Sequence, residues 1–141
     1  MSEVQNTSEI PAALEAAQNS WSCVQSKDKE GWLALMAEDI CMEDPIGVAL
    51  TNPTGEGIRG KEEVSAFYDK HMAESTITIE VHESRVAANT SAHVMTLTTA
   101  LPGGVISRVR GIFTYYVNEA GKITNLRGYW QMSDMSFEQP D

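Results

Sequence analysis

Residues 93–132 read HVMTLTTALPGGVISRVRGIFTYYVNEAGKITNLRGYWQM, and this stretch decides the fold. Side chains of similar character recur at every second position over residues 93–101, 105–117 and 124–132. A period of two is typical of β-strands that bury one face. Turn-forming residues interrupt the pattern at 102–104 and 118–121. The stretch therefore predicts long strands joined by tight connections, in a mostly antiparallel sheet.

Upstream of this stretch the period changes to that of a helix. Apolar residues recur at helical spacing from Ile10 to Val24, and Ser8 before them can cap a helix start. Asp28 is a second candidate cap, for a helix that runs through Met36 and closes at Glu38-Asp39. The sequence thus predicts two successive helices before the first strand.

Shorter segments complete the expected fold. Residues 40–44 are partly apolar and are stopped by Pro45, which predicts a brief strand. Residues 46–60 are rich in glycine and proline and predict a loop, and helical spacing returns over 61–72. Residues 77–82 alternate as another strand. This order predicts an α+β domain, with three helices packed on one face of the sheet.

The length of 141 residues fits a single domain over residues 1–141, with loose ends at 1–7 and 136–141. Hydrophobic residues make up 42%, which is enough to bury a core. No apolar run approaches the ~20 residues of a membrane span, so no span is expected. The first 20 residues carry acids and no lysine or arginine, which disfavours a secretory signal.

Charge and cysteine content narrow the partners further. A net charge of −10 repels phosphate backbones and anionic lipid surfaces, so neither nucleic acid nor a membrane is an expected partner. Cys23 and Cys41 have apolar neighbours and are expected to be reduced, which points to a cytoplasmic location. There is no Cys-x-x-Cys or His-Glu-x-x-His motif and no phosphate-binding glycine loop. We therefore expect no metal, nucleotide or flavin.

Asp44 is the residue with the clearest chemical potential. It follows the apolar pair Cys41-Met42 closely and is held from behind by Pro45. A carboxylate fixed at a strand end near apolar side chains can act as a general base. An Asp before Pro is also a common turn residue, so spacing alone leaves both interpretations open.

Three blocks around Asp44 resemble the ketosteroid isomerases. Residues 36–47 (MAEDICMEDPIG) resemble the segment that bears the base in that family. Residues 58–68 (IRGKEEVSAFY) resemble the start of a helix in that family, and residues 118–130 (NEAGKITNLRGYW) resemble its final hairpin. The resemblance implies a cone of the type shared with nuclear transport factor 2. In that cone a curved sheet wraps around an apolar pocket roofed by helices.

The resemblance also implies a mechanism, an allylic isomerisation that is a standard example of tuned carboxyl groups. An Asp base removes a proton beside a ketone and returns it two carbons away. The dienolate intermediate accepts hydrogen bonds from a Tyr and a protonated Asp. By this resemblance Asp44 is the base, Trp130 is the pocket tryptophan near it, and Tyr68 supports the oxyanion donor.

The sequence departs from the family at both oxyanion donors. The position of the main Tyr falls on Ser20, or on Trp21 if the helix slips by one, and that of the protonated Asp falls on Phe113. Losing one such donor typically lowers the rate ~10²–10³-fold. Three other polar side chains could replace the missing donors: Tyr68, His93 and Tyr115. Tyr115 shares the strand phase of Phe113.

These observations favour a steroid Δ5-to-Δ4 isomerase, or an isomerase of a similar flat apolar ketone. Asp44 would shuttle the proton, with Tyr68 and Tyr115 as further catalytic candidates. The small apolar ligand would contact Ser20 and an apolar lining formed by Trp130, Phe113, Met95, Leu97, Leu126 and Met132. We expect a homodimer that forms through the outer face of the sheet, where Arg108 and Arg110 point.

Two other functions remain open on the same fold. The missing donors favour a non-catalytic protein that binds steroids or similar apolar ligands. An epoxide hydrolase or polyketide cyclase is a further alternative. Epoxide opening would want a second acid and a water-orienting Asn near the base, and the sequence shows no clear set.

Overall fold

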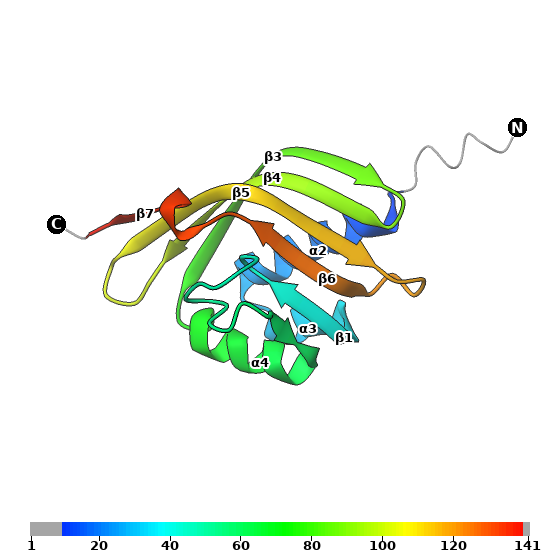
Figure 1. Ribbon diagram of the computed structural model, residues 1–141, viewed down its shortest axis with the longest axis horizontal. Coiled ribbons are helices and arrows are strands. Elements are labelled where there is room, and N and C mark those ends of the chain that lie inside the picture. Colours follow the sequence, from blue (N-terminus) through cyan, green and yellow to red (C-terminus); the bar gives the residue numbers. More distant parts are fainter. Residues whose placement is uncertain (1–9, 140–141) are drawn as a thin grey trace, which may run out of the picture.

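Three helices cover one face of a strongly curved sheet (Figure 1). The structure, a computed structural model, describes residues 10–139. Within that range the helices are α2 (Ala12–Ser26), α3 (Lys29–Ala34) and α4 (Gly60–His71). Asp28 caps α3 as expected, because its carboxylate accepts a 2.9 Å hydrogen bond from Gly31 N. Ser8, the expected cap of the first helix, lies outside the described residues.

The sheet has the strand order β2-β1-β6-β5-β4-β3, and β7 pairs with the free part of β5. Every pairing is antiparallel except that of β1 with β6. This arrangement confirms the expected α+β class, with a curved, mostly antiparallel sheet and three packed helices. The strands are β1 (Met36–Glu43), β2 (Ile58–Arg59), β3 (Thr76–Ala87), β4 (Thr90–Ala100), β5 (Ile106–Val117), β6 (Ile123–Tyr129) and β7 (Met135–Glu138).

The first strand is longer than the sequence predicted, and the preceding helix is shorter. The sequence predicted a second helix that runs through Met36 and ends at Glu38-Asp39. Instead α3 ends at Ala34, and Met36, Glu38 and Asp39 belong to β1. The register of β1 against β6 shifts between Met36 and Cys41. This irregularity leaves two consecutive exposed residues in the strand, so the period of two is lost and the strand start was missed.

The C-terminal segment is also more ordered than expected. The sequence predicted a strand over 124–132 and a loose end from 136, but β6 ends at Tyr129 and a short 3-10 turn, Met132–Asp134, follows. Residues 135–138 then form β7 on the end of β5 that extends beyond β6. A four-residue strand with three exposed side chains has too little alternation to be recognised from sequence.

The core lies between the helices and the concave face of the sheet. Helix α2 presents small side chains to the sheet at i, i+3, i+4 and i+7, which lets its backbone approach closely: Ala13, Ala16, Ala17 and Ser20. The larger core residues come from β1, α4 and the sheet centre, among them Met36, Ile40, Val64, Met95 and Phe113. Between residues 10 and 139, no helix combines the length and apolar character needed to cross a membrane.

Candidate functional site

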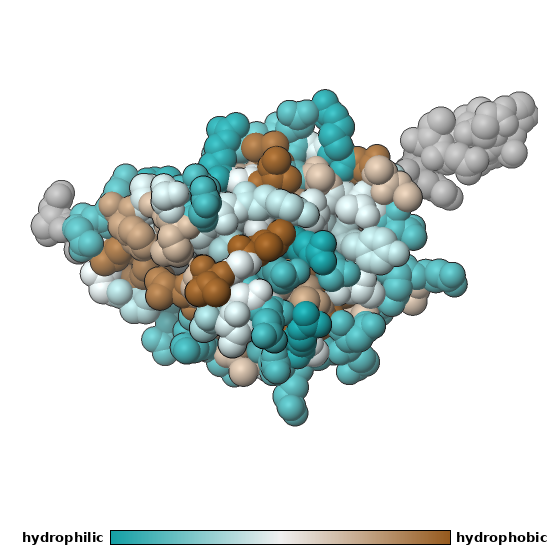
Figure 2. Space-filling model, viewed as in Figure 1, coloured by the Kyte–Doolittle hydropathy of each residue, from teal (hydrophilic) through white to brown (hydrophobic). Residues whose placement is uncertain are grey.

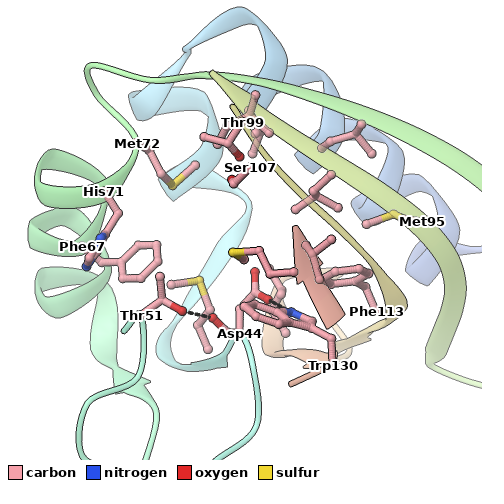
Figure 3. Close-up of a pocket in the computed structure, with 18 of the residues that line it drawn as sticks. Asp44, Thr51, Phe67, His71, Met72, Met95, Thr99, Ser107, Phe113 and Trp130 are labelled. Carbon is pink, nitrogen blue, oxygen red and sulfur yellow. Dashed lines mark hydrogen bonds between the residues drawn. The ribbon is translucent and has the colours of Figure 1, made fainter. Parts of the chain in front are cut away.

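A cavity of about 470 Å³ opens between the concave face of the sheet and the helices (Figure 3). Figure 3 shows Asp44, Trp130 and Phe113 gathered in one part of it, with Phe67 and His71 projecting from α4. The wall is mostly apolar. It brings together nine of the ten site residues that the sequence suggested: Asp44, Tyr115, Trp130, Phe113, Met95, Leu97, Leu126, Met132 and Ser20.

The carboxylate of Asp44 is held in this cavity by a hydrogen bond from the opposite half of the chain. Trp130 Nε1 donates to Asp44 Oδ1 over 2.8 Å. Asp44 directly follows β1 and Trp130 directly follows β6, and these two strands are parallel neighbours. The two residues therefore lie at the same end of neighbouring strands, and their hydrogen bond fixes the direction of the carboxylate.

The loop after β1 fixes the backbone of Asp44. Thr51 Oγ1 donates to the carbonyl oxygen of Asp44 over 2.5 Å. The fully buried Asn52 donates through Nδ2 to the carbonyl of Pro45 at 3.0 Å and accepts from Gly57 N at 2.9 Å. These contacts close the loop on itself. The sequence predicted only an irregular segment here.

Gly128 on β6 leaves the space that the Asp44–Trp130 pair occupies. A Cβ atom at this position would lie 2.5 Å from Asp44 Oδ1, 2.8 Å from Trp130 Nε1 and 3.1 Å from Phe113 Cε2. Real Cβ atoms essentially never approach other atoms below about 3.0 Å. The carboxylate and the indole can therefore lie against this strand only because residue 128 has no side chain.

Burial raises the pKa of Asp44 above its ordinary value, because desolvation disfavours the charged carboxylate. The hydrogen bond from Trp130 acts in the opposite direction and lowers this pKa. A raised pKa was the expectation from the apolar surroundings of Asp44. It makes the carboxylate a stronger base than an exposed aspartate.

The phenol of Tyr115 lines the buried end of the same cavity. Tyr115 is 3% exposed, and its Oη accepts a 3.0 Å hydrogen bond from Trp21 Nε1. Because Trp21 donates to this oxygen, the hydroxyl proton of Tyr115 is free to be donated elsewhere. Burial is the main cause that raises the pKa of Tyr115, and the charge of Asp44 raises it further. The hydroxyl therefore remains protonated and can act as a donor.

Ser20 and Trp32 complete that end of the cavity. Trp32 Nε1 donates to Ser20 Oγ over 3.1 Å. The Ser20 hydroxyl also lowers the pKa of Tyr115 through a hydrogen bond, although burial outweighs it. The serine at the expected oxyanion position is thus part of the polar group around Tyr115. Phe113, at the other expected donor position, contributes an apolar surface only.

His93, a candidate donor from the sequence, does not reach the cavity. Its Nδ1 lies 2.7 Å from Ser84 Oγ and its Nε2 lies 2.8 Å from Ser91 Oγ. Ser91 Oγ donates to the Ala13 carbonyl, so it accepts from Nε2–H, and Nδ1 accepts from Ser84. Both ring nitrogens are satisfied. Burial lowers the pKa of His93 to about 4, and its ring supports Tyr115 at 5.6 Å between centroids.

Tyr68 is also placed differently from the expectation. It does not belong to the described residues that line the cavity; its neighbour Phe67 does. The Tyr68 ring packs in the core against Trp32, with 5.9 Å between ring centroids. Adjacent helical residues point about 100° apart, so only one of the two can face the cavity. Among the described residues no hydrogen bond joins Tyr68 to Tyr115 or Ser20, so we propose no role for Tyr68 in the chemistry.

The described residues hold no cluster of three or more His, Cys, Asp or Glu side chains that could bind a metal ion. Asp44 is the only carboxylate among the described lining residues. The chemistry that this arrangement offers is proton transfer by Asp44, next to a phenol donor, inside an apolar wall.

Residues 17–126 match the SnoaL-like domain family. The chain belongs to that family. Among solved structures, the SnoaL-like chain is similar to Delta 5-3-ketosteroid isomerase from Mycobacterium sp., with 48% identity and a TM-score of 0.90 over 92% of this chain and 100% of that one. A computationally designed 17-OHP binder gives the same four values. No curated protein sequence matches the chain significantly.

RV0760c from Mycobacterium tuberculosis, in complex with estradiol-17beta-hemisuccinate, is another similar structure. It shares 51% identity and a TM-score of 0.87, over 91% of this SnoaL-like chain and 100% of that chain. An LEH-like epoxide hydrolase from M. tuberculosis has a TM-score of 0.73 at 15% identity, which shows a shared fold alone. The expected cone fold and the resemblance to ketosteroid isomerases are thus confirmed.

Sequence reasoning missed several polar members of this SnoaL-like site. Trp21 was expected at the site only if the helix register slips by one, and its hydrogen bond to Tyr115 links residues 94 positions apart. Thr51 and Asn52 lie in a loop that has no periodicity. Gly128 carried one weak signal, since an isolated glycine inside a strand often marks a close approach of other groups.

Proposed function

We propose that this chain is an isomerase of the Δ5-3-ketosteroid isomerase type, acting on a flat apolar ketone. The observation that carries the proposal is the partly buried carboxylate of Asp44, fixed by Trp130 in an apolar cavity that Tyr115 also lines. Relatives at about half identity support it, since they include such an isomerase and proteins with steroid ligands.

In this proposal Asp44 moves one proton within the substrate. Its ionised carboxylate removes a proton from the carbon between the carbonyl and the C=C bond. The electron pair of that C–H bond shifts into the carbonyl and gives a dienolate. The carboxyl group then returns the proton to the far carbon of the former C=C bond. The product is the conjugated ketone, and Asp44 is again ionised.

Tyr115 would stabilise the negative charge that develops on the substrate oxygen. Its O–H is a donor in a water-poor site, where such hydrogen bonds act most strongly. The N–H of Trp21 donates to the same hydroxyl oxygen and polarises the O–H bond. Phe113 supplies no second donor, so we expect slower turnover than with two donors, by about 10²–10³-fold.

The test is an ultraviolet assay for formation of the conjugated enone from a 3-oxo-Δ5 steroid. The Asp44→Asn variant should lose activity by orders of magnitude while it still binds steroid, because an amide keeps the shape but cannot take the proton. Tyr115→Phe should lower kcat more than it weakens binding, because the donor acts on charge in the transition state. Tyr68→Phe is the matched control and should retain parental kcat. Unchanged turnover in Asp44→Asn would refute the proton-transfer role.

A non-catalytic steroid-binding protein is the second candidate. It is favoured by the single donor at the oxyanion end and by the likeness to a designed 17-OHP binder. Titration with steroids, followed by the fluorescence of Trp130 and Trp21, measures binding without turnover. Saturable binding with no enone formation would support this candidate over the isomerase.

An epoxide hydrolase is the third candidate, and the cavity favours it less. Opening an epoxide with water requires a second acid near the base. Asp44 is the only acid among the described lining residues. Hydrolysis of a cyclic epoxide without isomerase activity would reverse this ranking.

We also propose that the chain forms a homodimer through the convex face of the sheet. Ile112 on β5, Tyr116 on β5 and Tyr129 on β6 are large side chains exposed on strands that meet there. Light scattering should give twice the 15.5 kDa chain mass. Tyr116→Arg should shift the mass toward a monomer, whereas Glu62→Arg on α4 should not. A parental monomer would contradict the proposal.

A further inference from the structure

The wall of the cavity is electrically uneven. Lys70 and His71, in the last turn of α4, belong to the lining together with Asp44. Among the described lining residues, Lys70 is the only Lys or Arg and Asp44 is the only Asp or Glu. Asp44 is partly buried beside Trp130, whereas Lys70 is exposed. The cavity therefore carries a negative group inside and a positive group at its opening.

The opening also carries apolar surface that the protein itself leaves uncovered. Leu50, Phe137 and Met132 line the cavity, yet they are 73%, 50% and 37% exposed. Figure 2 shows apolar side chains at the surface over the loop that follows β1. A ligand confined to the buried end would leave these side chains in water. A longer ligand would cover them, which is favourable because apolar area leaves water.

Half of the ten lysines and arginines form ion pairs between described residues, and Lys70 is not one of them. Lys29 pairs with Asp69, Lys61 with Glu38 and Arg127 with Glu43. None of the ion pairs between described residues involves Lys70. Burial and the charge of Lys70 both lower the pKa of His71, so His71 is neutral near pH 7 and offers a hydrogen bond beside the lysine charge.

We propose that the ligand of this cavity is a flat ring ketone whose far end bears a side chain with a carboxylate, which reaches Lys70 and His71 at the opening. This proposal rests on the proposed function, in which the ketone binds between Asp44 and Tyr115. The two charges fix the orientation. Asp44 repels an anionic group from the interior, and Lys70 attracts it at the rim, so the ring ketone enters first.

A lysine in the last turn of a helix also has a purely structural role, because it interacts favourably with the helix dipole. That role affects the stability of the fold and is indifferent to the charge of a ligand. A pair of ligands that differ only in charge therefore separates the two roles. A steroid ketone with a carboxylate-terminated side chain and its methyl ester form such a pair.

The experiment measures the equilibrium affinity of both ligands by tryptophan fluorescence, so it needs no turnover. The parent protein should bind the acid about 3- to 5-fold more tightly than the ester, as for an exposed ion pair. Lys70→Gln should abolish this preference, and 0.5 M salt should reduce it, with the Debye length shortened to below about 5 Å. Arg110→Gln is the matched control. It removes the same charge from an exposed position on β5 outside the cavity, and the preference should persist.

Equal affinity for acid and ester in the parent, or an unchanged preference in Lys70→Gln, would overturn the proposal. If the parent prefers the acid but forms no enone, the result would support a carboxylate on the ligand. It would contradict only the isomerase activity. Failure of both ligands to bind would overturn this inference together with the apolar-ligand part of the proposed function.

Discussion

Trp130 and Asp44 are 86 positions apart in the chain, and a 2.8 Å hydrogen bond joins the indole Nε1 to the carboxylate Oδ1. The parallel pairing of β1 and β6 brings them together, because each residue directly follows one of these strands. The hydrogen bond favours the ionised carboxylate, whereas burial disfavours it. The basicity of Asp44 is thus a balance between two opposing effects, and each can be changed separately.

Trp130→Phe keeps an aromatic ring beside Asp44 but removes the N–H donor. The pKa of Asp44 should rise further, because the interaction that lowers it is lost. A general base must be ionised, so the acid limb of the kcat/KM profile should move to higher pH. Trp32→Phe is the control, since its N–H serves Ser20. If the acid limb of Trp130→Phe coincides with that of the parent, the assignment of Asp44 as the general base would be contradicted.

Asp44→Asn should make the fold more stable at neutral pH. The pKa of Asp44 is raised in the folded state, so this group contributes stability below the unfolded pKa of ~3.9 and loses it as pH rises through the folded pKa. At pH 7 the buried charge therefore destabilises the fold, and the neutral amide should raise Tm by a few degrees, for roughly 1 kcal/mol.

Thermal unfolding at pH 7 and at pH 3 checks this stability change. The gain from Asp44→Asn should shrink at pH 3, where the parental carboxyl group is already protonated. Asp39→Asn, at an exposed position of β1, changes the net charge equally and should leave Tm nearly unchanged. A lower Tm in Asp44→Asn at pH 7 would mean that the carboxylate stabilises the fold instead.

Gly128→Ala should damage the site more than the fold. The added methyl group would approach Asp44 Oδ1 to 2.5 Å and Trp130 Nε1 to 2.8 Å, so one of these groups must move. A displacement near 1 Å at a reacting group can lower activity about 10²-fold. Enone formation should fall by that order, while far-ultraviolet circular dichroism keeps the parental spectrum. Activity within threefold of the parent would show that the pair adapts to a side chain here.

His93 should make the protein less stable in mild acid. Burial lowers its pKa to about 4 in the folded state, against ~6.5 in the unfolded chain. The unfolded state binds more protons between these values, so stability is full above pH ~6.5 and falls as the pH decreases toward 4. The loss approaches roughly 2–3 kcal/mol at pH 4.

Urea unfolding at pH 7 and pH 4.5 measures this loss in the parent and in His93→Gln. Glutamine retains donor and acceptor atoms for Ser84 and Ser91 but does not titrate, so the variant should lose less stability between the two pH values. Equal losses in both proteins would assign the acid sensitivity to other groups.

The sequence predicted best where the backbone geometry is regular. The period of two placed Phe113 and Tyr115 on one face of β5, and both line the cavity. Asp44 stood out because Pro45 and an apolar strand flank it, and its resemblance to the base of the ketosteroid isomerases singled it out further. These signals are local, so a single chain carries them.

The remaining parts of the site depend on packing between distant elements. Tyr68 and Phe67 differ by one helical step, and only the seating of α4 on the sheet decides which faces the cavity. The hydrogen bond from Trp21 to Tyr115 joins α2 to β5 and leaves no local pattern. The irregular register of β1 breaks the alternation that would have revealed that strand.

The parallel pairing of β1 with β6 also has a consequence for protein synthesis. Asp44 leaves the ribosome long before Trp130, its hydrogen-bond partner, has been made. At ~5–20 residues per second, the 86 positions from Asp44 to Trp130 take roughly 4–17 s. During that interval β1 lacks its neighbour β6, and the apolar wall that β4, β5 and β6 supply is incomplete. Ligand capture therefore has to wait until translation of the last strands is complete, and a nascent chain stalled before β6 should bind no steroid.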